Sequence, residues 1–142
     1  LFEIATQNGV DIAYGTAATK LLIDNTGKTI GVRVKGPGGY TEISAKAVVL
    51  ACGGFESNPE MRTRYLGPGW ELAKVRGVRF NTGDGIRMAM DIGAQPFGHW
   101  SGCHAVAWDL NAPAFGDRGP ITTSIPAAPR CRAAPALNLR DE

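Results

Sequence analysis

The sequence lacks three features that would each point to a particular class of protein. No apolar run approaches the roughly 20 residues that a bilayer-spanning helix needs, so we expect no transmembrane segment. The first residues, Leu1-Phe2-Glu3, have neither a basic lead nor an apolar segment, so we expect no signal peptide. The formal net charge is only +2 and the charges are scattered, which argues against nucleic acid as a partner.

Cysteine is also scarce. Cys52, Cys103 and Cys131 are odd in number and widely spaced, which fits a reducing cytoplasm better than a disulfide framework. His99 and His104 flank Cys103, but a structural zinc site needs four ligands, commonly paired across two elements. Neither of the other cysteines brings a partner of its own, so we expect no metal.

Glycine, abundant elsewhere, is almost absent from the last 24 residues, where only Gly119 occurs. This segment, residues 119–142, also holds four of the nine prolines and no aromatic residue. Because proline interrupts helices and strands, we predict an irregular Pro/Ala-rich tail. The chain starts at Leu1, in what reads as the end of a helix, so we expect it to be a fragment of a longer protein.

A folded core is nevertheless expected, because 44% of the residues are hydrophobic and only 20% are charged. An Asn-Gly pair at residues 8–9 predicts the end of an opening helix. Turn sequences at residues 25–28 and 36–39 separate β-favouring segments, which predicts an antiparallel β-meander within residues 10–45. The strands expected there are residues 10–14, 18–24, 29–35 and 40–45.

The most informative stretch is AVVLACGGFESNPE, residues 47–60. Its first six residues, 47–52, are apolar without polar alternation, as expected for a buried parallel strand. Gly53 and Gly54 permit a sharp turn and the close approach of a ligand that a Cβ would block. The following Asn-Pro pair can cap and begin a helix at residues 59–65. Since α/β folds place nucleotide cofactors where a strand ends in glycines before a helix, we predict an α/β protein that binds a dinucleotide.

A second glycine-rich motif, Thr-Gly-Asp-Gly at residues 82–85, precedes a predicted helix at residues 86–91. Thr82 or Asp84 can cap that helix. A cap alone does not need two flanking glycines, so the Asp84 carboxylate is also a candidate to accept a hydrogen bond from a ribityl or ribose hydroxyl. The residues predicted for the buried face of the helix are Ile86, Ala89 and Met90.

Other chemically capable side chains have plainer interpretations. Cys52 is expected to be a small buried side chain rather than a redox thiol. The tryptophans at positions 70, 100 and 108 are expected in the core or in pocket walls. The arginines at positions 76, 79 and 87 are expected to be solvated, and nothing in the sequence selects one of them for a carboxylate.

The chain resembles the flavoprotein subunits of fumarate reductase and succinate dehydrogenase in the order of four features. These are the meander, AVVLACGGFESNPEM, NTGDGIRMAMDIGA and a histidine ten residues later. The segment GHWSGCHAVAWDLNAP is most similar to the tricarballylate dehydrogenase branch. The resemblance covers residues 1–118. It implies an α/β fold, namely part of a Rossmann-like FAD-binding domain of the glutathione-reductase type. It also implies a three-stranded antiparallel meander and the start of a capping domain.

The resemblance implies FAD as the cofactor and assigns residues to it. Ala51, Gly53 and Gly54 match the glycine turn that lies against FAD in the family. Asp84 matches the aspartate of the family's Gly-Asp-Gly loop, and this aspartate contacts FAD in the family. The loop corresponds to residues 81–85 here. Ala18 matches the meander position whose backbone meets the adenine.

His104 matches the substrate-binding histidine of the family, which hydrogen-bonds a carboxylate. The family's His-Pro-Thr reads His104-Ala105-Val106 here, and its Gly-x-Gly-x-x-Gly loop for the pyrophosphate occurs nowhere in the chain. No residue is assigned to catalysis, and we expect this chain alone to be inactive.

These matches divide the chain into the C-terminal part of an FAD-binding domain (1–98), the start of a capping domain (99–118) and the tail (119–142). The implied function is a cytoplasmic FAD-dependent oxidoreductase acting on CH–CH bonds of a small carboxylate such as tricarballylate, succinate or fumarate. An electron-transfer protein is a candidate partner. Two alternatives stay open: a non-catalytic FAD-binding remnant or truncated gene product, and a related enzyme such as a ketosteroid dehydrogenase or an aspartate oxidase.

Overall fold

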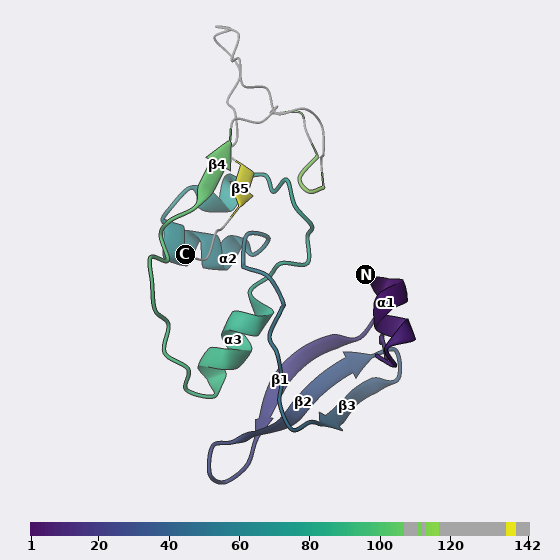
Figure 1. The fold of residues 1–142 in the computed structure, drawn as a ribbon. Helices are drawn as coiled ribbons and strands as arrows, with labels where there is room; N and C mark the ends of the chain where they lie inside the picture. Colours follow the sequence, from purple (N-terminus) through teal and green to yellow (C-terminus); the bar gives the residue numbers. More distant parts are fainter. Residues whose placement is uncertain (107–110, 112, 117–135, 139–142) are drawn as a thin grey trace, which may run out of the picture. The chain divides into compact units, whose positions relative to one another are not determined.

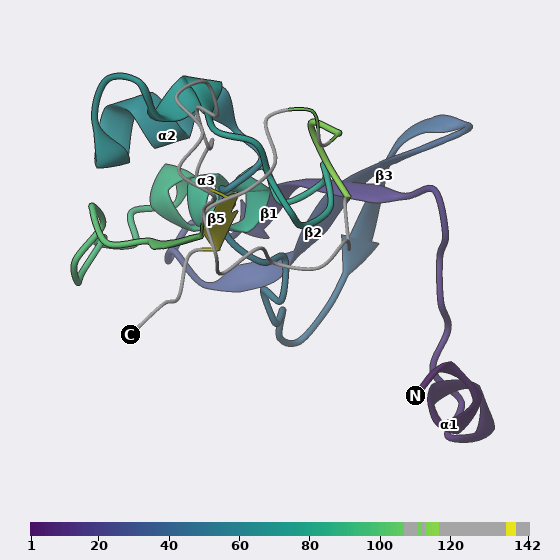
Figure 2. The same cartoon turned by 90° about the horizontal axis from the view of Figure 1, so that it is seen from above.

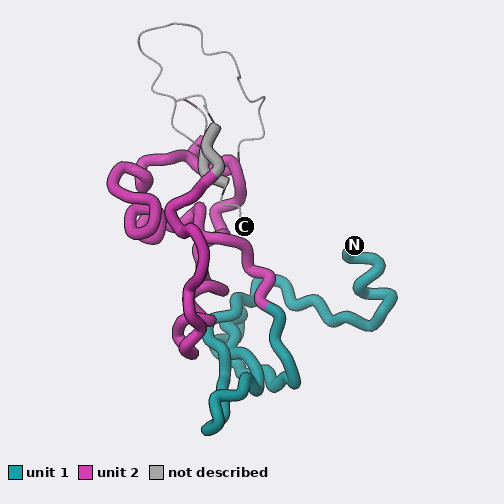
Figure 3. The backbone as a smooth tube through the Cα atoms, turned by 60° about the vertical axis from the view of Figure 1, so that its left-hand side comes forward, with its two compact units in different colours: residues 1–49 teal, residues 50–142 magenta. Residues whose placement is uncertain are grey.

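The computed structural model describes residues 1–106, 111, 113–116 and 136–138. The chain has two compact units, residues 1–49 and residues 50–142 (Figure 3). The predicted domain boundaries after residues 98 and 118 stay predictions.

The first unit is an antiparallel meander preceded by a short helix. The helix α1 (Phe2–Gln7) ends at Asn8, and Gly9 adopts a φ of +72°, as the Asn-Gly pair predicts. Figure 2 shows α1 clear of the sheet and joined to it by an extended segment. The predicted meander is confirmed, since its strands lie in chain order in one antiparallel sheet (Figure 1). They are β1 (Ala17–Ile23), β2 (Thr29–Gly36) and β3 (Gly39–Ser44).

Local turn chemistry fixes both hairpins of the meander. Between β1 and β2 the Asp24 carboxylate accepts hydrogen bonds from the Thr26 hydroxyl (2.6 Å), the Thr26 amide (2.8 Å) and the Lys28 amide (3.0 Å). These bonds, the Thr26 hydroxyl first, lower the pKa of Asp24. Between β2 and β3, Gly36 pairs with Gly39, whose φ of +102° favours glycine in this turn.

The interior of the meander is thin and closely spaced. Leu21 on β1 is buried, with 4% of its surface exposed. Gly31 on β2 is also buried, and a Cβ at this position would overlap the carbonyl oxygen of Ile43 on β3. Glycine is therefore required at the centre of the sheet for steric reasons.

Two predicted strands are absent, because residues 10–14 and 47–52 are irregular. Val49 is 88% exposed and Leu50 is 38% exposed, so the apolar run is not buried either. A strand is stable only where a neighbouring strand satisfies its backbone groups. Among the described residues no strand pairs with either segment, and both predictions are therefore wrong for this structure.

The second unit contains short helices joined by glycine-rich turns. The helix α2 begins where the sequence predicts, since the Asn58 side chain accepts a hydrogen bond from the Met61 amide (3.1 Å) and Pro59 occupies the first turn. In the described ranges, no helix has the length and apolar character to cross a bilayer. The helices of this unit are α2 (Pro59–Leu66), the 3₁₀ helix η1 (Trp70–Leu72) and α3 (Asp84–Asp91).

The second unit also contains a two-stranded antiparallel sheet formed by β4 (His104–Val106) and β5 (Ala136–Asn138). The strand β5 lies in the tail that we predicted to be irregular, and that prediction is wrong for these three residues. They follow the last proline of the sequence, so no proline interrupts their pairing. The rest of residues 119–142 lies outside the described residues.

The core of the second unit gathers around α2 and α3. Phe55, Met61 and Val75 are each less than 9% exposed, and Met88 on α3 is fully buried. The sequence pattern selected a different face of α3, whose residues are only half-buried. Two of them, Ile86 and Ala89, line a hollow instead of the core.

Candidate functional site

The two glycine-rich motifs lie side by side in the second unit, as residues 54–58 and 78–83. The Gly83 amide donates a hydrogen bond to the Gly54 carbonyl (3.0 Å). Gly83 has a φ of +80°, and a Cβ there would overlap the sulfur of Met61 on α2. Both facts require glycine at this position, which explains the first glycine of the Gly-Asp-Gly sequence without a ligand.

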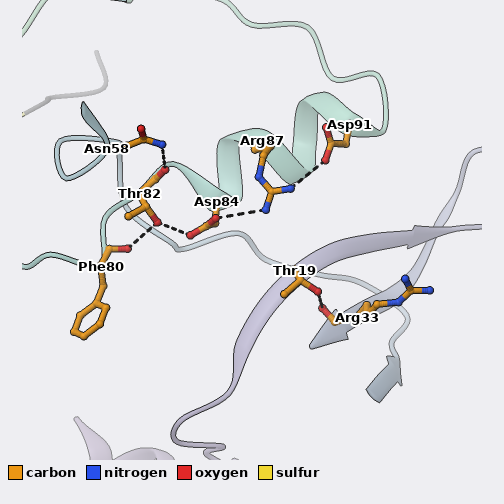
Figure 4. A network of polar contacts seen from close by, with 8 residues as sticks. All are labelled: Thr19, Arg33, Asn58, Phe80, Thr82, Asp84, Arg87 and Asp91. Atoms are coloured by element: carbon orange, nitrogen blue, oxygen red, sulfur yellow. Dashed lines mark hydrogen bonds and ion pairs between the residues drawn. The ribbon is translucent and has the colours of Figure 1, made fainter. Parts of the chain in front are cut away.

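Side chains strengthen the contact between the two motifs. The Ser57 hydroxyl donates to the Val78 carbonyl (2.6 Å). The Asn58 side-chain amide donates to the Thr82 carbonyl (2.9 Å), as Figure 4 shows. Asn58 therefore caps α2 with its oxygen and holds the second motif with its nitrogen.

Asn81 and Glu56 complete this framework. The Asn81 carbonyl accepts a hydrogen bond from the Ser57 amide (2.9 Å), and its side-chain amide donates to the Glu56 carboxylate. Glu56 is only 6% exposed, so this hydrogen bond satisfies a buried carboxylate. The same side-chain amide packs against Gly53, where a Cβ would lie 2.9 Å from Oδ1, 3.0 Å from Cγ and 3.1 Å from Nδ2 of Asn81.

A hollow of about 490 Å³ adjoins the framework. Gly85 forms part of its wall, because a Cβ there would lie only 3.0 Å from the Cβ of Cys52. Among the described residues, no charged side chain lines the hollow, so it suits an uncharged part of a ligand. The lining residues are Leu50, Ala51, Cys52, Gly53, Gly85, Ile86 and Ala89.

The structure separates the residues predicted for the first glycine turn. Ala51 and Gly53 line the hollow, and the φ of +71° at Gly53 favours glycine. Gly54 is not among the lining residues and instead accepts the hydrogen bond from Gly83. Cys52 is exposed, so the prediction of a buried cysteine is wrong, since the strand that would have buried it does not form.

Asp84 is the first residue of α3, and its exposed carboxylate is turned to neighbouring side chains. It accepts a hydrogen bond from the Thr82 hydroxyl (2.5 Å) and lies 3.4 Å from a nitrogen of Arg87, which also reaches Asp91 (Figure 4). Gly83 occupies the cap position of α3 with no side-chain hydrogen bond, so neither Thr82 nor Asp84 caps the helix as predicted. Contact between Asp84 and a cofactor stays a prediction.

Ala18 belongs to the first unit, and neither it nor His104 is among the residues that line the hollow. Ala18 is half-buried on β1, where it pairs with Val34 beside an irregularity in the ladder. At this irregularity the Thr19 hydroxyl donates to the Arg33 carbonyl (3.1 Å; Figure 4). His104 is the first residue of β4. The roles of both residues stay predictions.

Arg62 on α2 is the main feature of this unit that sequence reasoning missed. It is 3% exposed and donates hydrogen bonds to the carbonyls of Glu56, Trp70 (2.9 Å), Glu71 (2.9 Å) and Ala73 (3.3 Å). Burial lowers the pKa of Arg62, and the charge of Glu71 acts in the opposite direction. Its five N–H donors allow one side chain to tie the first glycine motif to η1.

An aromatic cluster packs behind the first motif. Phe55 stacks on Trp100 with ring centroids 6.2 Å apart, and Tyr65 lies 5.3 Å from Phe55 and 4.8 Å from Trp100. Trp100 packs in this cluster but is half-buried, so it does not lie in the core as predicted, and Trp108 lies outside the described residues.

Side chains that favour metals do not come together in the described part of the chain, where no three of His, Cys, Asp and Glu form a group that could hold an ion. His99 has its Nε2 atom 2.9 Å from the Ser101 hydroxyl. Cys103 is half-buried, and burial raises the pKa of its thiol.

The hollow fits part of a dinucleotide cofactor. Its walls are backbone, small side chains and aliphatic groups, which suit a flat ring or a sugar better than a charged pyrophosphate. A framework of glycines keeps Cβ atoms away from it on two sides. Together with the meander, these features are those of a protein that binds a nucleotide cofactor.

Comparison with known families identifies the cofactor. Residues 1–107 match the family model described as an FAD binding domain. The chain therefore belongs to this FAD-binding family, and the prediction of FAD as cofactor is confirmed.

Relatives of known name fall into two groups. The chain is 35% identical over 95 residues to a probable fumarate reductase of Shewanella frigidimarina, covering 66% of this chain and 16% of that protein. It is 37% identical over 94 residues to a 3-oxosteroid 1-dehydrogenase of Mycobacterium tuberculosis, covering 61% of this chain and 16% of that protein. The chain thus spans 16% of the length of these curated relatives.

Solved structures show the same two groups. The open conformation of a flavocytochrome c3 fumarate reductase matches with a TM-score of 0.67 and 33% identity, over 75% of this chain and 19% of that one. A 3-ketosteroid Δ1-dehydrogenase from Sterolibacterium denitrificans, in complex with 1,4-androstadiene-3,17-dione, matches with a TM-score of 0.70 and 31% identity, over 78% of this chain and 20% of that one. These similarities support the prediction of a partial FAD-binding domain of a flavoenzyme.

Proposed function

We propose that this chain supplies part of the FAD-binding surface of an oxidoreductase that acts on carbon–carbon bonds. The observation that carries the proposal is the uncharged hollow between the first glycine turn and α3, in a chain of the FAD-binding family. The named relatives, a fumarate reductase and 3-oxosteroid dehydrogenases, are enzymes whose names imply adding or removing hydrogen across such a bond.

The residues of this chain bind and position the cofactor in this proposal. Bound FAD supplies an acceptor for the hydride that leaves one carbon of the substrate. Ala51 and Gly53 present backbone to one side of the hollow, while Ile86 and Ala89 exclude water from the other. We assign no residue of this chain to the transfer of the accompanying proton, which matches the absence of a catalytic assignment from the sequence.

A small carboxylate is the substrate that we favour. His104 matches a carboxylate-binding histidine, and an imidazolium forms strong charge-assisted hydrogen bonds with carboxylates. Tricarballylate, succinate and fumarate all belong to this class. An electron-transfer protein as partner and a cytoplasmic location belong to the same proposal.

A 3-ketosteroid is the second candidate substrate. The observation that favours it is the similarity to 3-oxosteroid dehydrogenases, which is as high in identity as the similarity to the fumarate reductase. The Ala105-Val106 pair after His104 is apolar and fits a steroid as well as a carboxylate.

Filling the hollow tests cofactor binding by the full 142-residue chain. The substitution Ala89→Phe places a ring in the hollow, and we expect at least a tenfold loss of affinity for FAD, about 1.4 kcal/mol or more, in titrations followed by flavin fluorescence. Asp91→Phe is the matched control, because Asp91 is exposed at the end of the same helix and is not among the residues that line the hollow. Equal affinities for the two variants would contradict the proposed site.

The substrate class is tested on the enzyme at its natural length. Anaerobic addition of succinate, tricarballylate or a 3-ketosteroid should bleach the flavin absorbance only for the true substrate class. If the substrate is a carboxylate, His104→Ala raises KM for it. Bleaching by the steroid alone would refute the carboxylate assignment and leave cofactor binding intact.

A further inference from the structure

Glu56 is a buried carboxylate that neither the proposed chemistry nor the sequence analysis uses. It is 6% exposed, and its side chain accepts a hydrogen bond from the Asn81 amide. Its own carbonyl accepts from the buried Arg62. The Glu56 backbone is thus held by Arg62, while the Glu56 side chain forms a separate hydrogen bond with Asn81.

The carboxylate determines which way the Asn81 amide faces. An ionised carboxylate can only accept hydrogen bonds, so it selects the orientation in which the Asn81 nitrogen points to Glu56. The whole Asn81 amide group packs against Gly53, where a Cβ would lie 2.9 Å from the amide oxygen, 3.0 Å from its carbon and 3.1 Å from its nitrogen. Gly53, in turn, is part of the wall of the hollow.

The Asn81 backbone is fixed independently of its side chain. Its carbonyl accepts the Ser57 amide (2.9 Å), one residue along from Glu56. Changing the Asn81 or Glu56 side chain therefore leaves this backbone contact available. The side-chain hydrogen bond has a separate effect, which is to hold the Asn81 amide group in place against Gly53.

We propose that Glu56 and Asn81 form a positioning pair, in which Glu56 orients the Asn81 amide against Gly53 and so fixes the glycine wall of the FAD pocket. The inference rests on the proposed binding of FAD in that hollow. Neither residue is among those that line the hollow, and Asn81 contacts Gly53, which is, so both act through Gly53. The pair would explain why a charged residue is buried next to an uncharged pocket.

Swapping the two functional groups tests the pair in the full 142-residue chain. Asn81→Asp places two carboxylates together, and we expect the affinity for FAD to fall about tenfold or more. The double variant Glu56→Gln with Asn81→Asp restores a hydrogen bond of reversed direction and keeps an oxygen facing Gly53. We expect it to recover most of the lost affinity, and Glu56→Gln alone, whose amide can both donate and accept and so no longer selects one orientation, to fall between Asn81→Asp and the wild type.

A second readout needs no cofactor and separates positioning from stability. NMR relaxation of the Gly53 amide should show increased motion in Asn81→Asp and wild-type motion in the double variant. Far-UV circular dichroism establishes that each variant is folded. A folded Asn81→Asp chain with unchanged Gly53 motion would overturn the proposal, as would a double variant that behaves like Asn81→Asp.

These outcomes are distinguishable from a failure of the proposed function. If Ala89→Phe leaves FAD binding intact, the hollow is not the FAD site, but Gly53 motion still decides whether the pair positions the wall. If Ala89→Phe weakens binding and all Glu56 and Asn81 variants bind FAD like the wild type, the pocket stands and the positioning pair is refuted.

Discussion

Replacing Arg62 by methionine is the sharpest test of how the second unit is held together. The guanidinium is the common donor to four carbonyls, on Glu56 and on the segment Trp70–Ala73. Methionine keeps a long, flexible side chain that can fill much of the same space. The substitution therefore removes the hydrogen bonds while limiting the cavity that it leaves.

The expected magnitude follows from which carbonyls lose their partner in a buried place. Glu56 and Ala73 are 6% and 9% exposed, whereas Glu71 is exposed and Trp70 is half-buried, so water can reach the latter carbonyls. An unpaired buried acceptor costs about 1–3 kcal/mol. Two of them give about 2–6 kcal/mol, and we expect a loss of about 3 kcal/mol because the freed carbonyls relax towards solvent.

Urea unfolding of the full chain, followed by circular dichroism, measures this loss. With a slope of about 1–3 kcal/mol per molar urea, the midpoint should fall by about 1–3 M. Arg64→Met is the matched control, because Arg64 lies on the same helix and forms an exposed ion pair with Glu60, for an expected change below about 1 kcal/mol. Equal midpoints for the two variants would show that the buried hydrogen bonds of Arg62 do not stabilise the unit.

Three further results are expected. Gly31→Ala should destabilise the meander by about 1–3 kcal/mol in thermal unfolding, because its Cβ overlaps a carbonyl on β3, and an unchanged melting temperature would contradict the close spacing. Because the folded pKa of Asp24 is depressed, its contribution to stability is present above the ordinary pKa of an aspartate and is lost as pH falls through the lower folded pKa; Asp24→Asn should abolish this part of the pH dependence. Iodoacetamide at neutral pH should alkylate exposed Cys52 faster than Cys103, which is half-buried and whose thiol pKa is raised, and mass spectrometry of peptides would reveal the opposite order if the exposures are wrong.

The meander could be predicted because its signals are local. Asp24, Gly27 and Gly39 occupy turn positions whose conformation depends on the residue itself and its immediate neighbours. Three of the four strands predicted for the meander, residues 18–24, 29–35 and 40–45, lie within one residue of their observed bounds, whereas residues 10–14 form no strand. The Asn58-Pro59 start of α2 was predictable for the same reason.

The segment 47–52 could not be predicted correctly from its own residues. An apolar run indicates burial, but whether it becomes a strand depends on a neighbour that supplies the ladder. In the described residues there is none, and Val49 is therefore exposed. Without this strand Cys52 is exposed as well, and the prediction that it is buried depended on the same strand.

The buried polar network of Arg62, Glu56 and Asn81 was missed because charged residues carry no periodic signal for burial. Charged side chains are usually exposed, so a pattern alone assigns them to the surface. The one available signal was the position of Glu56 within the glycine motif, where the chain turns inward between Gly54 and the cap of α2. In contrast, two residues that line the hollow, Ala51 and Gly53, were predicted from the sequence as cofactor-binding residues.

The hydrogen bonds between residues 54–58 and residues 78–83 make the hollow a cooperative structure. Glu56 and Asn81 are 25 positions apart, and closing a loop of that length costs about 3 kcal/mol in chain entropy. Whichever cross-link forms first bears that cost, and the others then form within a ring that is already closed. A state with only some of these hydrogen bonds is consequently the least stable arrangement. The wall of the hollow therefore forms or unfolds in one step rather than bond by bond.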